Sequence, residues 1–153
     1  MLGHHEFLLG HYASALSHYE MVIAGGGSSK GVRKRAIVCY IQARHPEKAL
    51  PLFTSLVVED VAYVLGQEQD REGCPCPVII EEYMSHLTDS IGHADLLALG
   101  MLWAYCDTQE SIGWFKRALQ QKQEDPFVVA ILRELSSCIM SRSSPHASSL
   151  ERN

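Results

Sequence analysis

Apolar and small side chains recur at intervals of three and four residues between residues 9 and 23. They occupy Tyr12, Ala15, Leu16, Tyr19, Val22 and Ile23. An α-helix has about 3.6 residues per turn, so this spacing places the side chains in one stripe on one face of a helix. The pattern therefore predicts an amphipathic helix.

The same local pattern recurs along the chain. Ala15 and Tyr19 are matched 34 positions later by Ala49 and Phe53, which have the same separation of four residues. Residues 111–119 form a third copy. Self-similarity at a fixed period of this length is typical of helix-turn-helix repeats. The sequence therefore predicts an all-α protein built from antiparallel helix pairs.

These motifs resemble the tetratricopeptide repeat family. The first helix of a unit in that family carries Leu-Gly and then an aromatic residue, and the second helix carries Ala and an aromatic four residues later. Leu99-Gly100 and Trp103 match the first helix. Ser111 and Phe115 match the second, with Ser in place of Ala.

Two units depart from the family pattern. In the first unit Leu2-Gly3 match, but Glu6 stands where the first helix has its aromatic residue. In the second unit Ala36-Ile37 replaces Leu-Gly, and Pro46 occupies the aromatic position at the start of the second helix. The Sel1-like repeat, also made of paired helices, is the alternative family because residues 114–118 resemble its second helix. The strict 34-residue spacing favours the tetratricopeptide repeat.

The resemblance implies an α-solenoid, a right-handed superhelical stack of antiparallel helix pairs. We expect one repeat domain over residues 1–140, with units at about 1–29, 30–63 and 93–125, an irregular insert or degenerate repeat at 64–92, and a capping helix at 126–140. The Ser-rich residues 141–153 predict a disordered tail. Because Leu2-Gly3 would lie within a first helix, we also expect that the chain begins inside a unit of a longer repeat protein.

The resemblance also implies a partner-binding surface, because the first helix of each pair in such a stack lines a concave groove. The matching positions are His4, Leu8, Lys34, Val38, Gln42, Leu97, Met101 and Tyr105. Such a groove would suit an amphipathic helix or an extended peptide.

Four cations cluster at the start of the second unit. Lys30, Arg33, Lys34 and Arg35 oppose the dipole of the helix expected there, so local helix stability does not explain them. They form either a solvated face or a surface for an acidic partner.

Composition limits the classes of partner and compartment. The chain has 13 Lys and Arg against 18 Asp and Glu, a formal net charge of -5, which disfavours nucleic-acid binding. No apolar run approaches the roughly 20 residues of a membrane span. Cys39, Cys106 and Cys138 fall within helical patterns, where a thiol packs as a small hydrophobic group. This use of cysteine predicts a reducing compartment, the cytosol or the nucleus.

Signatures of catalysis are missing from the sequence. It contains no phosphate-binding loop, nucleophile elbow or His-Glu-x-x-His helix, and its histidines do not define a four-ligand metal site. We therefore expect a non-catalytic scaffold or adaptor that binds another protein, works within a larger assembly and needs no cofactor or metal. The alternative is a small metal- or redox-responsive module that uses Cys74 and Cys76 of the Cys-Pro-Cys-Pro segment.

Overall fold

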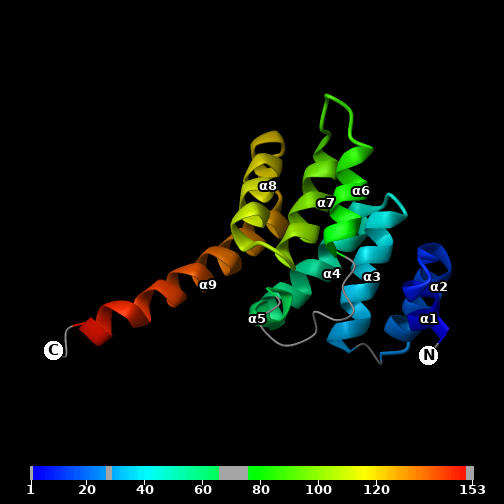
Figure 1. Ribbon diagram of the computed structural model, residues 1–153, viewed down its shortest axis with the longest axis horizontal. Coiled ribbons are helices and arrows are strands. Elements are labelled where there is room, and N and C mark those ends of the chain that lie inside the picture. Colours follow the sequence, from blue (N-terminus) through cyan, green and yellow to red (C-terminus); the bar gives the residue numbers. More distant parts are fainter. Residues whose placement is uncertain (1, 27–28, 66–75, 151–153) are drawn as a thin grey trace.

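The computed structural model describes residues 2–26, 29–65 and 76–150, and these residues contain helices and no strands. The all-α prediction is confirmed. Within these ranges the helices are α1 (Leu2–Leu8), α2 (Tyr12–Ala24), α3 (Lys30–Gln42), α4 (Pro46–Glu59), α5 (Val61–Val64), α6 (Cys76–Ser85), α7 (His93–Ala104), α8 (Thr108–Gln121) and α9 (Pro126–Leu150) (Figure 1).

Three helix pairs form hairpins joined by short turns: α1 with α2, α3 with α4, and α7 with α8. Two turns include a left-handed backbone conformation, at Gly10 with φ of 78° and at Arg44 with φ of 66°. A left-handed residue after a helix ends it and redirects the chain. The short turns therefore hold each pair of helices antiparallel.

The recurring sequence positions lie inside these hairpins. Ala15 and Tyr19 on α2, Ala49 and Phe53 on α4, and Ser111 and Phe115 on α8 are all fully buried. Each small residue lies one turn before the aromatic residue, on the same face of its helix. The pattern that repeats in the sequence therefore forms the inner face of the second helix of each pair.

α3 and α7 run in opposite directions. Lys34, near the start of α3, has its Nζ 4.9 Å from the ring centroid of Tyr105, just after the end of α7. Arg44, just after the end of α3, has its Cζ 4.9 Å from the ring centroid of Tyr83. The Tyr83 hydroxyl donates a hydrogen bond to Asp95 in the first turn of α7. The start of α3 thus lies beside the end of α7.

This direction differs from the regular stack that we expected. When one small rotation relates each pair to the next, the first helices of all pairs run the same way. Here α6, which follows α4 and α5 in the chain, adds one more pass through the molecule beside α7 (Figure 1). One additional crossing reverses the direction of every later helix, so α7 runs against α3. The difference arises within residues 64–92, the insert in our sequence-based division.

α4 lies at the centre of the packing. It contacts α3, α5, α7 and α9. Its Phe53 ring lies 6.2 Å from the ring of Tyr105 and 5.9 Å from that of Phe115, measured between centroids. In a regular stack each unit contacts only its neighbours, whereas here α9 returns to a helix of the second hairpin. The helices are therefore more bundle-like than the expected linear stack.

α9 is longer than the expected capping helix. It runs to Leu150, whereas we expected helix only to residue 140 and a disordered tail after it. Composition suggested the tail because serine is frequent there. Serine is only moderately worse than alanine inside a helix, and extending an existing helix costs less than starting one. The helical backbone beyond residue 140 is consistent with the small cost of adding serines to a helix that has already formed.

Candidate functional site

Three residues of the expected groove are buried in the core. Val38, Leu97 and Met101 have exposed fractions of 1%, 4% and 0%. A partner cannot reach them in this structure. The physical reason is that α7, which carries Leu97 and Met101, packs against α4, α6 and α8, whereas α3, which carries Val38, packs against α2 and α4. An apolar residue on a helix has the same sequence pattern whether it lines a groove or fills a core.

Two other residues of the expected groove lie in contact with each other. The Lys34 ammonium lies over the ring of Tyr105, a cation–π contact between α3 and the end of α7. The Tyr105 hydroxyl oxygen is buried, and burial raises the pKa of Tyr105 well above its ordinary value. The contact therefore joins α3 to the end of α7, and burial keeps the phenol protonated.

The remaining groove residues do not complete one surface. Leu8 is exposed, and His4 and Gln42 are half-buried. His4 and Leu8 belong to α1, which packs against α2 and lies apart from α7 (Figure 1). The structure thus leaves the eight expected residues divided among the core, the Lys34–Tyr105 contact, α1 and, for Gln42, the end of α3.

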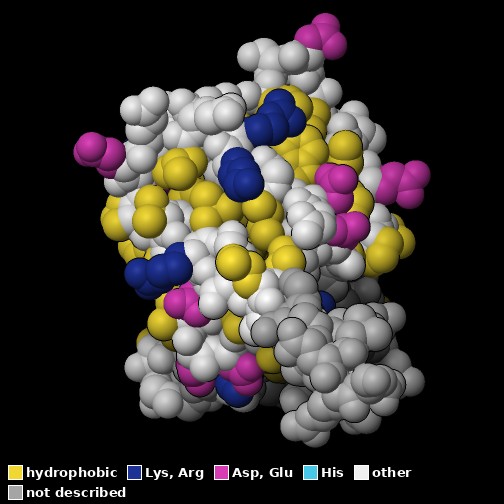
Figure 2. Space-filling model, turned by 90° about the vertical axis from the view of Figure 1, so that its left-hand side faces the viewer, with side chains coloured by type: hydrophobic (Ala, Val, Ile, Leu, Met, Phe, Trp, Pro, Cys, Tyr) yellow, Lys and Arg dark blue, Asp and Glu magenta, His cyan; other side chains and the backbone are white. Residues whose placement is uncertain are grey.

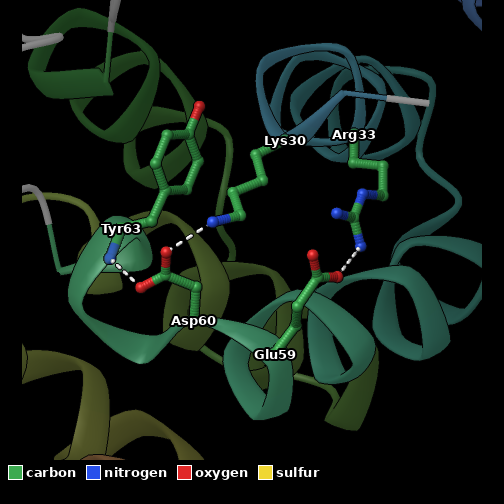
Figure 3. A network of polar contacts seen from close by, with 5 residues as sticks. All are labelled: Lys30, Arg33, Glu59, Asp60 and Tyr63. Carbon is green, nitrogen blue, oxygen red and sulfur yellow. Dashed lines mark hydrogen bonds and ion pairs between the residues drawn. The ribbon is translucent and has the colours of Figure 1, made fainter.

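Two of the four clustered cations bind acids of the same chain (Figure 3). Lys30 Nζ lies 2.6 Å from Asp60 Oδ2, and Arg33 Nη1 lies 2.7 Å from Glu59 Oε2. Glu59 and Asp60 stand at the end of α4, beside the start of α3 in the antiparallel hairpin. The hairpin therefore supplies the acidic groups that we had considered for a partner. An acid pair at the end of the following helix was the sequence signal for these contacts.

The bound cations change the acidity of both carboxyl groups. The hydrogen bond from Lys30 lowers the pKa of Asp60, and a second bond from the backbone N–H of Tyr63 adds to this effect. The hydrogen bond from Arg33 lowers the pKa of Glu59 in the same way. Both groups are therefore ionised at neutral pH, and their negative charge offsets the cations near the start of α3.

A shallow, largely open depression with an accessible volume of about 460 Å³ lies between α2, α3 and α4. Its volume falls in the range of small binding pockets. Apolar side chains and polar or charged side chains both line it. The apolar ones are Ile23, Ala24, Pro51 and Leu52, and the polar ones are Glu20, Tyr40, Lys48 and Ser55. We call this the α2–α4 cavity.

The polar side chains of the α2–α4 cavity present both signs of charge. The Tyr40 hydroxyl donates a 2.7 Å hydrogen bond to Glu20 Oε1. Burial, together with this bond, raises the pKa of Tyr40 to about 12, so the phenol keeps its proton and holds Glu20 in place. Lys48 on α4 is exposed and makes no ion pair within the described part of the chain. The cavity thus offers a carboxylate from α2 and an ammonium group from α4.

Pro51, which lines this cavity, leaves one carbonyl of α4 without its usual helix hydrogen bond. It stands inside α4, which stays helical through it. Because proline has no backbone N–H, the carbonyl of Glu47 lacks its usual helix donor four residues later. From the sequence we expected no site on this side of the helix pairs, although a proline within a helix was a visible signal.

The chain matches no family model, no curated protein and no solved structure. The resemblance to the tetratricopeptide repeat stays a prediction from the motifs.

The structure does not test the alternative metal or redox site, because Cys74 lies outside the described residues and only the backbone of Cys76 is described, at the start of α6. Within the described ranges, no three His, Cys, Asp or Glu side chains are grouped so that they could hold a metal ion. Cys39 is fully buried, and burial raises the pKa of its thiol to about 12. It packs as the small hydrophobic group that we expected, whereas the same expectation was wrong for Cys106, which is exposed in the turn after α7. Among the described helices, none combines the length and the apolar character needed to cross a membrane.

Proposed function

We propose that this chain is a non-catalytic protein-interaction module that binds a helical or extended segment of another protein in the α2–α4 cavity. The observation that carries the proposal is the combination of an apolar lining with opposite charges from Glu20 and Lys48. Apolar contact supplies affinity in such sites, whereas a few polar groups fix the orientation of the ligand.

The cavity indicates the chemistry of the partner segment. An apolar side chain would contact Ile23 and Leu52, a cation of the segment would pair with Glu20, and an acid would pair with Lys48. An N–H group could bind the Glu47 carbonyl. The proposed partner therefore has mixed charge, in place of the acidic peptide suggested by the cluster at the start of α3.

The repeat architecture belongs to the same proposal. In this interpretation the three hairpins are tetratricopeptide-like units, and α6 interrupts their stack. We also propose a reducing compartment, the cytosol or the nucleus, because buried Cys39 is used for packing.

Exposed apolar surface supports a place in a larger assembly. α9 carries exposed Phe127, Val129 and Met140, with exposed fractions of 40%, 47% and 73%. Figure 2 views the side on which α5, α8 and α9 lie in Figure 1, and hydrophobic side chains gather there among charged ones. Apolar surface of this kind often marks a protein interface.

The test begins with a photo-crosslinking residue at Ser55, which lines the cavity, and at exposed Gln123 as the control position. Proteins crosslinked only from Ser55 are identified by mass spectrometry, and the contacted segment is made as a peptide. Calorimetry then compares its binding to the wild type, to the charge swap Glu20→Lys with Lys48→Glu, and to a matched swap, Lys122→Glu with Glu124→Lys, at two exposed positions.

We expect the cavity swap to weaken binding by about tenfold or more and the matched swap to leave it unchanged. Circular dichroism must show equal helicity, because Glu20→Lys also removes the acceptor of Tyr40. Equal binding by both swapped variants would refute the proposed site. A failure to crosslink any protein from Ser55 above the control position would refute it as well.

A further inference from the structure

α6 buries one face and exposes the other. Ile79, Ile80 and Tyr83 have exposed fractions of 2%, 4% and 4%. Val78 and Met84 on the same helix are 68% and 42% exposed. The buried residues are two adjacent branched side chains and an aromatic one three residues later, which is one face of a helix. α6 thus lies against the rest of the protein as an amphipathic helix lies in a binding site.

Tyr83 fixes the position of α6. Its hydroxyl donates a 2.7 Å hydrogen bond to Asp95 Oδ1 in the first turn of α7. The Arg44 guanidinium, in the turn after α3, lies over its ring. Asp95 also accepts a bond from the backbone N–H of Gly92, so its carboxylate is held at the start of α7 whether or not Tyr83 is present. These polar contacts add directional recognition to the apolar face.

The other helices are connected to one another without α6. α6 packs chiefly against α7, whereas α7 also packs against α4 and α8. α9 contacts both α4 and α8. The helices α4, α7, α8 and α9 therefore form a closed set of contacts. The surface beneath α6 belongs to a body held together by these contacts.

We propose that this surface, formed by α7 and the turn after α3, is a helix-binding site, and that α6 is its resident occupant. The competing ligand is an amphipathic helix from a partner, with two adjacent branched aliphatic residues and a tyrosine three residues later. The tyrosine hydroxyl would bind Asp95, and its ring would bind Arg44. This site is separate from the α2–α4 cavity, so it stands or falls independently of the function proposed there.

Binding of a partner helix requires release of α6. The apparent affinity for a competing helix is the intrinsic affinity reduced by the small fraction of molecules in which α6 is detached. A change that detaches α6 should therefore raise the affinity for a helix supplied in trans. α6 would act as an internal inhibitor of this site.

The test uses the full chain and a labelled peptide with the sequence of residues 77–87. Ile80→Glu places a charge on the buried face and should detach α6. Val78→Glu introduces the same residue on the exposed face and serves as the matched control. Tyr83→Phe is a milder variant that keeps the ring over Arg44 and removes the hydroxyl with its hydrogen bond to Asp95. Fluorescence anisotropy measures peptide binding, and hydrogen exchange reports the protection of each helix.

We expect the Ile80→Glu variant to bind the peptide at least about tenfold more tightly than the wild type or the Val78→Glu variant. Its α6 should exchange rapidly, with α4 and α8 still protected. The peptide affinity of the Tyr83→Phe variant should lie between that of the wild type and that of the Ile80→Glu variant. The inference is overturned if α6 exchanges rapidly without a gain in peptide binding. It is also overturned if α4 and α8 lose protection together with α6, because α6 would then be an integral part of the core.

Discussion

Gly100 in α7 lies against the ring of Phe115 in α8. A Cβ atom at Gly100 would lie 2.9 Å from three carbons of that ring, closer than real Cβ contacts allow. The Ser111 hydroxyl donates a 2.7 Å hydrogen bond to the carbonyl of Gly100 and fixes the same crossing. Gly3 has a similar relation to Tyr19, because its Cβ would lie 3.2 Å from Cε1 of that ring. The Leu-Gly motif thus permits close packing of two helices.

Gly100→Ala should destabilise the protein. The added methyl group overlaps the Phe115 ring, which is fully buried and cannot easily move. We expect the free energy of unfolding to fall by about 1–3 kcal/mol, the usual cost of overpacking a core. Urea denaturation followed by circular dichroism measures the change.

The matched control is Gly113→Ala in α8. Nothing lies within 4 Å of the position of its added Cβ. Alanine favours the helix over glycine, so this variant should be more stable by about 0.5–1 kcal/mol. Equal changes in the free energy of unfolding for Gly100→Ala and Gly113→Ala would contradict the close contact between Gly100 and Phe115.

The sequence predicted what local periodicity determines. The helices and the buried aromatic residues Tyr19, Phe53 and Phe115 follow from the spacing of three and four and from its recurrence. The direction of α7 did not follow, because it depends on whether residues 64–92 cross the molecule once more. Local patterns carry no information on that long-range choice.

The candidate site was harder to predict for a related reason. Val38 and Met101 are apolar and lie on helix faces, which is equally true of groove and core residues. The α2–α4 cavity depends on how residues of three helices come together, such as Glu20 with Tyr40. Only the partners of the basic cluster could have been inferred, because antiparallel pairing brings the end of α4 beside the start of α3.

The ion pairs between α3 and the end of α4 should make stability depend on pH. Asp60 and Glu59 have pKa values below their ordinary 3.8 and 4.5 in the folded protein. Their contribution to stability is therefore complete above the ordinary values and is lost as the pH falls through the lower folded values. Surface ion pairs are individually weak, so we expect a modest change.

The measurement is urea denaturation at a series of pH values between 7 and 3. The double variant Lys30→Met with Arg33→Met removes both cations and should lose less stability than the wild type below about pH 4.5. Asp60→Asn removes the negative charge that pairs with Lys30, but its side-chain oxygen can still cap α5 at the N–H of Tyr63. This variant therefore separates the ion pair from the helix cap. If the wild type and the double variant change in parallel over this pH range, these pairs do not cause the dependence.

The described thiols should differ strongly in reactivity. The thiolate is the reactive form, and burial raises the pKa of Cys39 to about 12. Cys106 is exposed, and Cys138 is partly exposed. Iodoacetamide at pH 8, followed by peptide mass spectrometry, should label Cys106 first and Cys39 only after denaturation. Alkylation of Cys39 in the native protein as fast as that of Cys106 would mean that α3 opens readily at this position.

Pro51→Ala separates the stability of α4 from the function that we propose for the cavity. Alanine restores the backbone N–H that can bind the Glu47 carbonyl, and it relieves the clash of a proline ring within a helix. Proline also restricts the unfolded chain, which offsets part of the gain. We therefore expect an increase of about 1–2 kcal/mol in the free energy of unfolding, measured by urea denaturation.

The same variant should bind the crosslinked partner segment less tightly. Its Glu47 carbonyl would be occupied by the helix, and the cavity would lose the apolar ring of Pro51. A protein that becomes more stable and binds more weakly is the expected outcome when a local defect serves a binding site. Greater stability with unchanged binding would show that the Glu47 carbonyl does not bind the partner segment. A loss of stability would show that packing of the Pro51 ring outweighs the missing hydrogen bond.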